Sequence, residues 1–310
     1  MAVRPTLTVG LGNFGATFAP GEWGGFVDLG RAAEDAGIDR VVVVDHVVMG
    51  PHTENYMWGK FPVPPDAPWL EPLTVLASVA AVTNRVRLAT GILIAPLRPP
   101  ALLAKQVATL DQMSGGRVDL GVGTGWQREE YDAQGLAFED RGQLLDDSLA
   151  ACRALWRDTP AALETPTLSF RDIYCMPKPV QPGGVPVWIA GTLHQRNLAR
   201  VVEYGAGWIP IMGETVEGIA ASVQRIRDAC AGAGRDPSTL QVQAPLRLVM
   251  GDGGRPDLDA SMASVPELLA AGATDVIVTL RAFARDAASS PGAMVRIRDA
   301  FDAATTDLAG

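Results

Sequence analysis

The sequence predicts an α/β fold, a single (β/α)8 TIM barrel spanning residues 1–310, and three observations support it. Eight short apolar runs each precede a helical pattern, which fits one barrel of eight units. The runs are β-branched and continuously apolar, as expected for parallel strands covered on both faces. Glycine and proline separate the runs from the helical patterns. A doubly wound sheet is the alternative, but such a sheet rarely needs eight units.

The expected elements follow one another as strand and helix along the whole chain. The strands are expected at residues 7–11, 41–44, 86–94, 118–122, 187–189, 207–211, 240–249 and 275–280. The helices are expected at residues 23–36, 71–82, 100–113, 141–156, 195–204, 216–233, 265–271 and 291–303. Pro100 suits the first turn of its helix, and Gly115–Gly116 follow that helix as a stop.

Two connections are longer than usual and predict insertion loops after strand 2 and before strand 5. Residues 47–70 are aromatic and Pro-rich, and residues 158–186 contain an expected hairpin at 167–184. Long loops at the carboxyl-terminal rim of a barrel usually cover or shape a pocket. Plain packing over the barrel mouth is the alternative.

Charge and cysteine content exclude several classes of protein. Lys and Arg number 26 against 35 Asp and Glu, a net charge of −9, which disfavours a nucleic-acid binder or a polybasic membrane clamp. No apolar run reaches the roughly 18 residues that a membrane span needs. The N-terminus lacks a signal-peptide pattern, and three scattered cysteines, Cys152, Cys175 and Cys230, argue against a disulfide framework. We therefore expect a cytoplasmic protein.

Asp45 and His46 directly follow the run VVVV, at the expected end of the second strand. Barrel enzymes build their sites on the face formed by the carboxyl ends of the strands. Histidine transfers protons near neutral pH, and a neighbouring acid can orient it. His46 is therefore the candidate catalytic residue, with Asp45 beside it. A structural histidine is the alternative.

Glycines mark the ends of the third and fourth strands. Gly91 lets a flat ligand approach the main chain, or it is a bulge that ends the strand. The run LGVGTGW contains Gly121, Gly123 and Gly125 and bares backbone N–H groups, but it matches neither a Rossmann fingerprint nor a P-loop. Trp126 either stacks on the ring system of a ligand or packs over the mouth of the barrel.

Gly191 and Thr192 end the fifth strand and precede a helix. N–H groups and a hydroxyl at a helix N-terminus suit a phosphate, although Thr192 as an ordinary helix cap is the alternative. No acid, Cys and His residues cluster with metal-ligand spacing, so no metal is expected.

Together these segments resemble the bacterial luciferase-like monooxygenase family, in particular its branch of coenzyme F420-dependent oxidoreductases. The resemblance covers nearly the whole chain, and its most specific stretch is LAKQVATLDQMSGGRVDLGVGTGW. It is strongest from Asp45-His46 through that stretch to PVQPGGVPVWIAG. It implies a deazaflavin or flavin at the barrel mouth.

The resemblance also implies a role for each matching residue. His46 matches the proton donor or acceptor and Asp45 its neighbour near the ring, and Gly91-Ile92 match a position that commonly carries a non-proline cis peptide. The backbone contacts to the cofactor are matched by Gly123, Thr124 and Gly125. The residues that line the pocket are matched by Glu129 and Glu130, and the phosphate end of the cofactor is matched by Gly191 and Thr192. Trp126 stands where the sugar-phosphate dehydrogenase branch has Glu, which disfavours that activity.

The resemblance implies an F420-dependent oxidoreductase that transfers a hydride between the deazaflavin and a small organic substrate, with His46 assisting proton transfer. One alternative is an FMN-dependent monooxygenase that uses molecular oxygen. The other is a protein that binds a flavin or deazaflavin without turning it over, since fold does not give function. A homodimer or higher homo-oligomer is expected.

Overall fold

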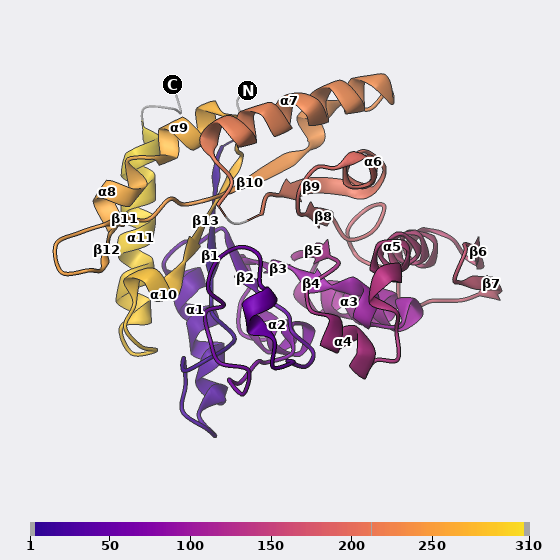
Figure 1. Ribbon diagram of the computed structural model, residues 1–310, viewed down its shortest axis with the longest axis horizontal. Coiled ribbons are helices and arrows are strands. Elements are labelled where there is room, and N and C mark those ends of the chain that lie inside the picture. Colours follow the sequence, from indigo (N-terminus) through magenta and orange to yellow (C-terminus); the bar gives the residue numbers. More distant parts are fainter. Residues whose placement is uncertain (1–3, 212, 307–310) are drawn as a thin grey trace.

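Eight parallel strand positions close into a barrel in the computed structural model, which describes residues 4–211 and 213–306 (Figure 1). The barrel strands are β1 (Thr6–Gly10), β2 (Arg40–Val43), β3 (Arg87–Thr90), β4 (Leu93–Ile94), β5 (Val118–Gly123), β8 (Val187–Ala190), β9 (Gly205–Ile209), β10 (Gln241–Pro245) and β13 (Asp275–Thr279). The short strands β3 and β4 both pair with β5 and together fill one of the eight positions. They pair in the order β3, β2, β1, β13, β10, β9, β8, β5, and β5 pairs back to β3. The predicted fold class is confirmed.

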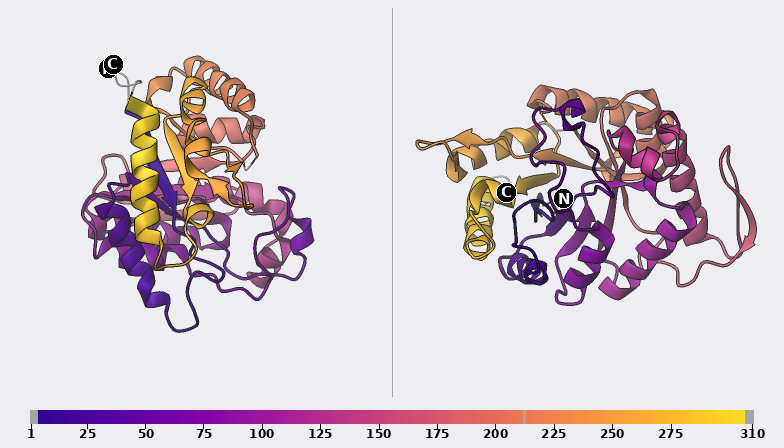
Figure 2. Two further views of the ribbon diagram at one scale, coloured as in Figure 1. Left: turned by 90° about the vertical axis from the view of Figure 1, so that its left-hand side faces the viewer. Right: turned by 60° about the horizontal axis from the view of Figure 1, so that its bottom comes forward.

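Helices surround the barrel on its outer side (Figures 1 and 2). They are α1 (Phe26–Asp35), α2 (Pro72–Ala80), α3 (Pro100–Ser114), α4 (Arg128–Ala133), α5 (Arg141–Arg157), α6 (Gln195–Tyr204), α7 (Val216–Gly232), α8 (Leu258–Met262), α9 (Val265–Ala270), α10 (Leu280–Phe283) and α11 (Ser290–Thr305). Pro100 begins α3, and Gly115 ends it in the left-handed conformation at φ 68°. Within the described part of the chain, no helix has both the length and the apolar character that crossing a membrane requires.

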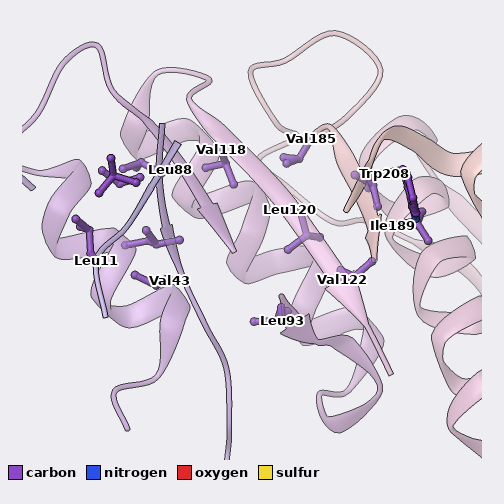
Figure 3. Packing of buried hydrophobic residues seen from close by; sticks show 14 of the residues in the cluster. Leu11, Val43, Leu88, Leu93, Val118, Leu120, Val122, Val185, Ile189 and Trp208 are labelled. Atoms are coloured by element: carbon purple, nitrogen blue, oxygen red, sulfur yellow. The ribbon is translucent and has the colours of Figure 1, made fainter. Parts of the chain in front are cut away.

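Apart from polar residues at their amino-terminal ends, the strands are mostly apolar because both of their faces are covered. Every residue of β2 and β5 is buried, as the continuous apolar runs predicted. Figure 3 shows Val43, Leu88, Val118 and Leu120 on neighbouring strands, with helices behind them. The same core continues to Trp208 on β9, which is 1% exposed.

A buried ionic network closes the amino-terminal end of the barrel, and we call it the floor network: Thr8, Arg40, Arg87, Asp119 and Asp275. Arg40 donates to Asp119 at 2.8 Å and to Asp275 at 2.9 Å. Arg87 binds both oxygens of Asp119, at 2.6 and 2.7 Å. Burial raises the pKa of Asp119, but the charges and hydrogen bonds of Arg40 and Arg87 outweigh burial and hold it below its usual value.

Three expected strands differ from the observed ones by more than one residue at an end. The strand expected at 86–94 is divided into β3 and β4 by Gly91 and Ile92. The strand expected at 240–249 ends at Pro245, because the chain then leaves the barrel. β9 begins at Gly205, two residues early, because α6 runs directly into it; a Cβ on Gly205 would lie 2.8 Å from the carbonyl oxygen of Val201.

The hairpin before β8 lies earlier than predicted. Its strands are β6 (Ala161–Glu164) and β7 (Ser169–Ile173), whereas the prediction placed the hairpin at 167–184. It projects away from the barrel in Figure 2. A second small hairpin, β11 (Val249–Met250) with β12 (Pro256–Asp257), was missed because its strands have two residues each.

Candidate active site

His46 and Glu130 form a hydrogen-bonded pair at the carboxyl-terminal mouth of the barrel. His46 follows β2, and Glu130 lies on α4, the helix after β5. Nδ1 of His46 lies 2.9 Å from Oε2 of Glu130, and Oε1 accepts the N–H of Val47 at 3.0 Å. The His46 side chain is 9% exposed and that of Glu130 is 1% exposed. Because a carboxylate is an acceptor, Nδ1 donates to it, which leaves Nε2 as the imidazole nitrogen for a ligand.

Asp45, a candidate for orienting His46, does not do so, because His46 is hydrogen-bonded to Glu130. The carboxylate of Asp45 binds Arg98, with its oxygens 2.6 and 3.1 Å from the guanidinium nitrogens. One oxygen also accepts the N–H of Ile94 at 2.9 Å. Successive side chains of an extended segment point to opposite sides, so sequence neighbours separate in space. Asp45 therefore fixes β4, and Glu130 orients His46.

Arg98 ties three segments of the mouth together. Besides Asp45 it contacts Glu71 at 2.8 Å, and Glu71 accepts the N–H of Thr74 at the start of α2. Burial lowers the pKa of Arg98, but the hydrogen bonds and charges of Asp45 and Glu71 outweigh burial and raise it. No periodicity or motif in the sequence points to this arginine.

Aromatic side chains cover His46, as the composition of the 47–70 loop predicted. The ring centroid of His46 lies 4.6 Å from that of Trp69, 5.6 Å from Phe61 and 6.0 Å from Trp126, each edge to face. Trp126 also packs on Tyr56 and Phe61, so it forms part of the roof. We call these rings the aromatic cluster: Phe14, Tyr56, Trp58, Phe61, Trp69 and Trp126.

The peptide bond between Gly91 and Ile92 is cis, as the resemblance implied for this position. A Cβ on Gly91 would lie 2.6 Å from Cγ2 of Val42 on the neighbouring strand. A side chain at position 91 would therefore displace β2, the strand that precedes His46.

The Gly-x-Gly-x-Gly run makes room for the segment that follows β3. A Cβ on Gly121 would lie 2.0 Å from the carbonyl oxygen of Thr90. Cβ atoms on Gly123 and Gly125 would lie 3.1 and 3.0 Å from the side chains of Ile92 and Ile94, respectively. The glycines therefore let β3 and β4 pack closely on β5, a role that the sequence interpretation missed. Thr124 stays partly exposed, and its carbonyl oxygen accepts the hydroxyl of Tyr131 at 2.5 Å.

Gly191 and Thr192 lie between β8 and the first turn of α6. Gly191 has φ 106°, a left-handed value, and Thr192 is exposed. Thr192 does not cap α6, because Nδ1 of His194 accepts the N–H of Asn197 instead. The Asn197 side chain donates to the carbonyl oxygens of Ala190 and Thr192 at 3.0 and 3.1 Å, which fixes this turn.

A sequence model of the family described as luciferase-like monooxygenase matches residues 9–294 of the chain. The chain belongs to this family.

Two curated relatives show how far the sequence similarity of this luciferase-like protein extends. An uncharacterised protein of Mycobacterium tuberculosis is 36% identical over 167 residues, 54% of this chain and 58% of the relative. A phthiodiolone/phenolphthiodiolone dimycocerosates ketoreductase of Mycobacterium bovis is 29% identical over 244 residues, 76% of this chain and 63% of the relative. The chain thus covers less than two thirds of either relative.

Two solved structures share the fold of this luciferase-like protein. A monooxygenase from Streptomyces bottropensis has a TM-score of 0.77 at 20% identity, covering 95% of this chain and 98% of its own. An F420-dependent secondary alcohol dehydrogenase, bound to an F420–acetone adduct, has a TM-score of 0.77 at 15% identity, covering 96% and 99%. The family membership supports an enzyme, with both F420-dependent and flavin-dependent neighbours in the fold.

Glu129 lies beside Gly50, in the segment that follows β5. Its side chain packs on Gly50, where a Cβ would lie 2.6 Å from it. It lines a pocket of about 330 Å³ together with Trp126 and Phe138. Trp126 therefore stands between this pocket and His46.

The structure gathers at the mouth most of the residues that the luciferase-like resemblance singled out. His46 and Glu130 are in contact, and the segments around Gly91, Gly123 and Gly191 end neighbouring barrel strands. Sequence reasoning missed Arg98, the pairing of Glu130 with His46, and Trp69. The density of aromatic residues in the 47–70 loop was the one signal that included Trp69.

Proposed function

We propose that this luciferase-like protein is a coenzyme F420-dependent oxidoreductase that transfers a hydride between the deazaflavin and a small organic substrate. The observation that supports this most directly is the buried His46–Glu130 pair at the carboxyl-terminal mouth of the barrel. A carboxylate on Nδ1 orients the imidazole, so that Nε2 gives a proton to the substrate or takes one from it. A binding protein without turnover needs no such pair.

The residues at the mouth fit a planar ring. A Cβ on Gly123 would lie 3.1 Å from Cδ1 of Ile92 and 3.9 Å from Cβ of Ala190, so two of these neighbouring strand ends, Gly123 and Ala190, carry an absent or small side chain and the third presents the apolar side chain of Ile92. In the proposal the ring lies over Ile92, Gly123 and Ala190, near Thr124 and Gly125. When bound, a deazaflavin or flavin supplies the centre that accepts or donates the hydride.

The turn before α6 fits the phosphate of such a cofactor. The first N–H groups of a helix have no intrahelical acceptor and attract anions. Two guanidinium groups nearby, Arg196 and Arg200, share the carboxylate of Asp146, and a third, Arg225, donates to the carbonyl oxygen of Leu193 at 2.7 Å. These three guanidinium groups supply local positive charge in a chain of net charge −9. In the proposal, Gly191 and Thr192 hold the phosphate here.

Titration of the purified protein with F420 and with FMN, followed by an oxygen-electrode assay, tests the choice of cofactor. We expect saturable binding of F420 and no substrate-dependent oxygen consumption by the F420 complex. The alternative is an FMN-dependent monooxygenase. The similarity in fold to the Streptomyces monooxygenase favours this alternative. FMN-dependent oxygen uptake, coupled to substrate, would overturn the proposal in favour of that alternative.

The variant His46→Gln tests the proton-transfer role. We expect turnover to fall by about 10²–10⁴-fold, as is usual when a positioned proton-transfer group is lost. His52 provides a matched control, because its Nδ1 also lies 2.9 Å from a carboxylate, that of Glu54, but the pair is exposed. His52→Gln should lower turnover far less than His46→Gln does. Unchanged turnover in His46→Gln at saturating substrate would contradict the assignment.

A further inference from the structure

The chain from His46 to Gly50, which we call the His46 segment, has little apolar support between its two ends. It follows β2, and Val47 and Val48 in its middle are 37% and 43% exposed. Burial of apolar side chains is the main favourable contribution to folding, and here it is largely missing. The position of the His46 segment therefore depends on its hydrogen bonds.

Gln127 holds the far end of the His46 segment. Its Oε1 accepts the N–H of Gly50 at 2.8 Å, and its Nε2 donates to the carbonyl oxygen of Gly50 at 3.3 Å. A side-chain amide can make both bonds to one backbone residue, because it carries a donor and an acceptor. Gln127 is 2% exposed and Gly50 is buried, a setting in which hydrogen bonds are electrostatically stronger than in water. The side chain therefore fixes Gly50 at two points.

The Gln127 side chain is not used by its own helix. Gln127 is the N-cap residue of α4, a position at which a polar side chain commonly accepts an N–H of the first turn, but its side chain makes no such bond. Beside it, Glu129 leaves room only for glycine, because a Cβ on Gly50 would lie 2.6 Å from the Cβ and Cγ of Glu129. The contact between Gly50 and α4 is therefore closely packed as well as hydrogen-bonded.

The same end of α4 carries Glu130, the partner of His46. The carboxylate oxygens of Glu130 lie 2.9 Å from Nδ1 of His46 and 3.0 Å from the backbone nitrogen of Val47. Glu130 thus holds the start of the His46 segment, and Gln127 holds its end. Hydrogen bonds weaken steeply when donor and acceptor lose their alignment. Because the segment is short, release of Gly50 would also weaken the bond between His46 and Glu130.

We propose that Gln127 is a positioning residue for proton transfer: its two bonds to Gly50 keep Nδ1 of His46 aligned with the carboxylate of Glu130. Gln127 acts through Gly50 and not on the reacting atoms. Small displacements of a reacting group, of about 1 Å, can cost about a hundredfold in rate. The consequence for catalysis rests on the proposed function, whereas the alignment itself can be measured without cofactor or substrate.

The test reads the tautomer of His46 from imidazole ¹⁵N resonances of the purified full chain, at about pH 8, where an ordinary imidazole is neutral. In the wild type we expect the Nδ1–H tautomer, because a carboxylate accepts at Nδ1. Glu130→Leu removes that acceptor and sets the reference for an unaligned ring. Gln127→Met keeps the length of the side chain without its amide, and should move the tautomer ratio of His46 at least about half of the way to that reference.

Two controls accompany this measurement. Gln112→Met removes an exposed amide that donates to the carbonyl oxygen of Lys178 at 2.8 Å, and His46 should keep its wild-type tautomer in this variant. His194 is an internal reference, because its Nδ1 accepts the N–H of Asn197 and its ring is therefore the Nε2–H tautomer. Its resonances should not change in Gln127→Met. A general loosening of the fold would not change His46 alone.

A second measurement needs no variant to fold. In hydrogen exchange of the wild type, the N–H groups of Val47 and Gly50 should have protection factors within about threefold of each other, because the two ends of the His46 segment open together. An unprotected Gly50 beside a protected Val47 would overturn the inference. So would a wild-type tautomer ratio of His46 in Gln127→Met, or a wild type without the Nδ1–H tautomer. Failure of the wild type to bind F420 or FMN would instead overturn the proposed function, and the tautomer of His46 would still decide the role of Gln127.

Discussion

The two ends of the barrel differ in how completely their buried polar groups are hydrogen-bonded. At the amino-terminal end, the floor network pairs Arg40 with Asp119 and Asp275, and each of these side chains is at most 4% exposed. At the carboxyl-terminal end, His46 has one partner, Glu130, and Nε1 of Trp69 has none. A satisfied network stabilises one arrangement, whereas at the mouth Nε2 of His46 is left for a ligand. The contrast matches the general division of barrels into a stability face and a catalytic face.

The largest expected effect is on the free energy of unfolding, and it comes from removing the arginine at the centre of the floor network. Arg40→Met leaves Asp119 and Asp275 without their shared cation, and removing one partner of a buried ion pair costs about 3–5 kcal/mol. Urea unfolding measures this loss. Arg153→Met is the control, because its pair with Glu203 at 2.8 Å is exposed and should be worth at most about 1 kcal/mol. Equal stabilities of the two variants would contradict the role of the floor network.

At the mouth, Glu130→Gln should lower turnover and leave stability nearly unchanged. The amide keeps the shape but loses the charge that orients His46. A hydrogen bond to a charged group is worth about 1.5–3 kcal/mol, equivalent to a ten- to hundredfold fall in kcat. The control is Glu54→Gln, the partner of the exposed His52, which should have wild-type kcat. If kcat does not change in Glu130→Gln, then the pair has no catalytic role.

Between the two ends, Gly121→Ala should destabilise the barrel by about 1–3 kcal/mol, because the new Cβ would lie 2.0 Å from a backbone oxygen. The same contact should displace Thr90 and weaken cofactor binding. Gly232→Ala, where a Cβ meets nothing within 4 Å, should be neutral or slightly stabilising. Both are measured by urea unfolding, and a neutral Gly121→Ala would show that β3 and β5 can separate without cost.

The smallest effect concerns pH and lies at the amino-terminal end. Glu34 accepts the N–H groups of Asn84, Arg85 and Val86. Burial raises its pKa, but these hydrogen bonds outweigh burial and lower it below the ordinary 4.5. As the pH falls, the unfolded chain therefore takes up this proton first. The stabilisation is complete above about pH 4.5 and is lost as the pH falls through the folded-state pKa.

Urea unfolding between pH 3 and 7 should therefore show a steeper acid loss of stability in the wild type than in Glu34→Gln, by about 1 kcal/mol. Parallel profiles for the two proteins would mean that Glu34 does not contribute through its charge.

Local pattern was enough to locate most of the fold. The helix at 195–204 matches α6 at both ends, and the prediction of α3 was one residue short. Such long elements carry their signal in their own residues. β11 and β12, with two residues each, carry no such signal, and the misplaced hairpin depended on pairing between β6 and β7.

The sequence by itself determined the barrel, and it predicted the carboxyl-terminal mouth as the site with His46 within it, because periodicity and residue type are local properties. Only the tertiary structure decided the partners. Asp45 is next to His46 in the chain but binds Arg98, while Glu130, on a helix after another strand, orients the imidazole. In the sequence, Trp69 is one of several aromatic residues in the 47–70 loop. Only the folded structure shows that its indole N–H is buried without an acceptor. Contacts of this kind depend on the direction in which the folded backbone points each side chain. A local sequence pattern does not contain that information.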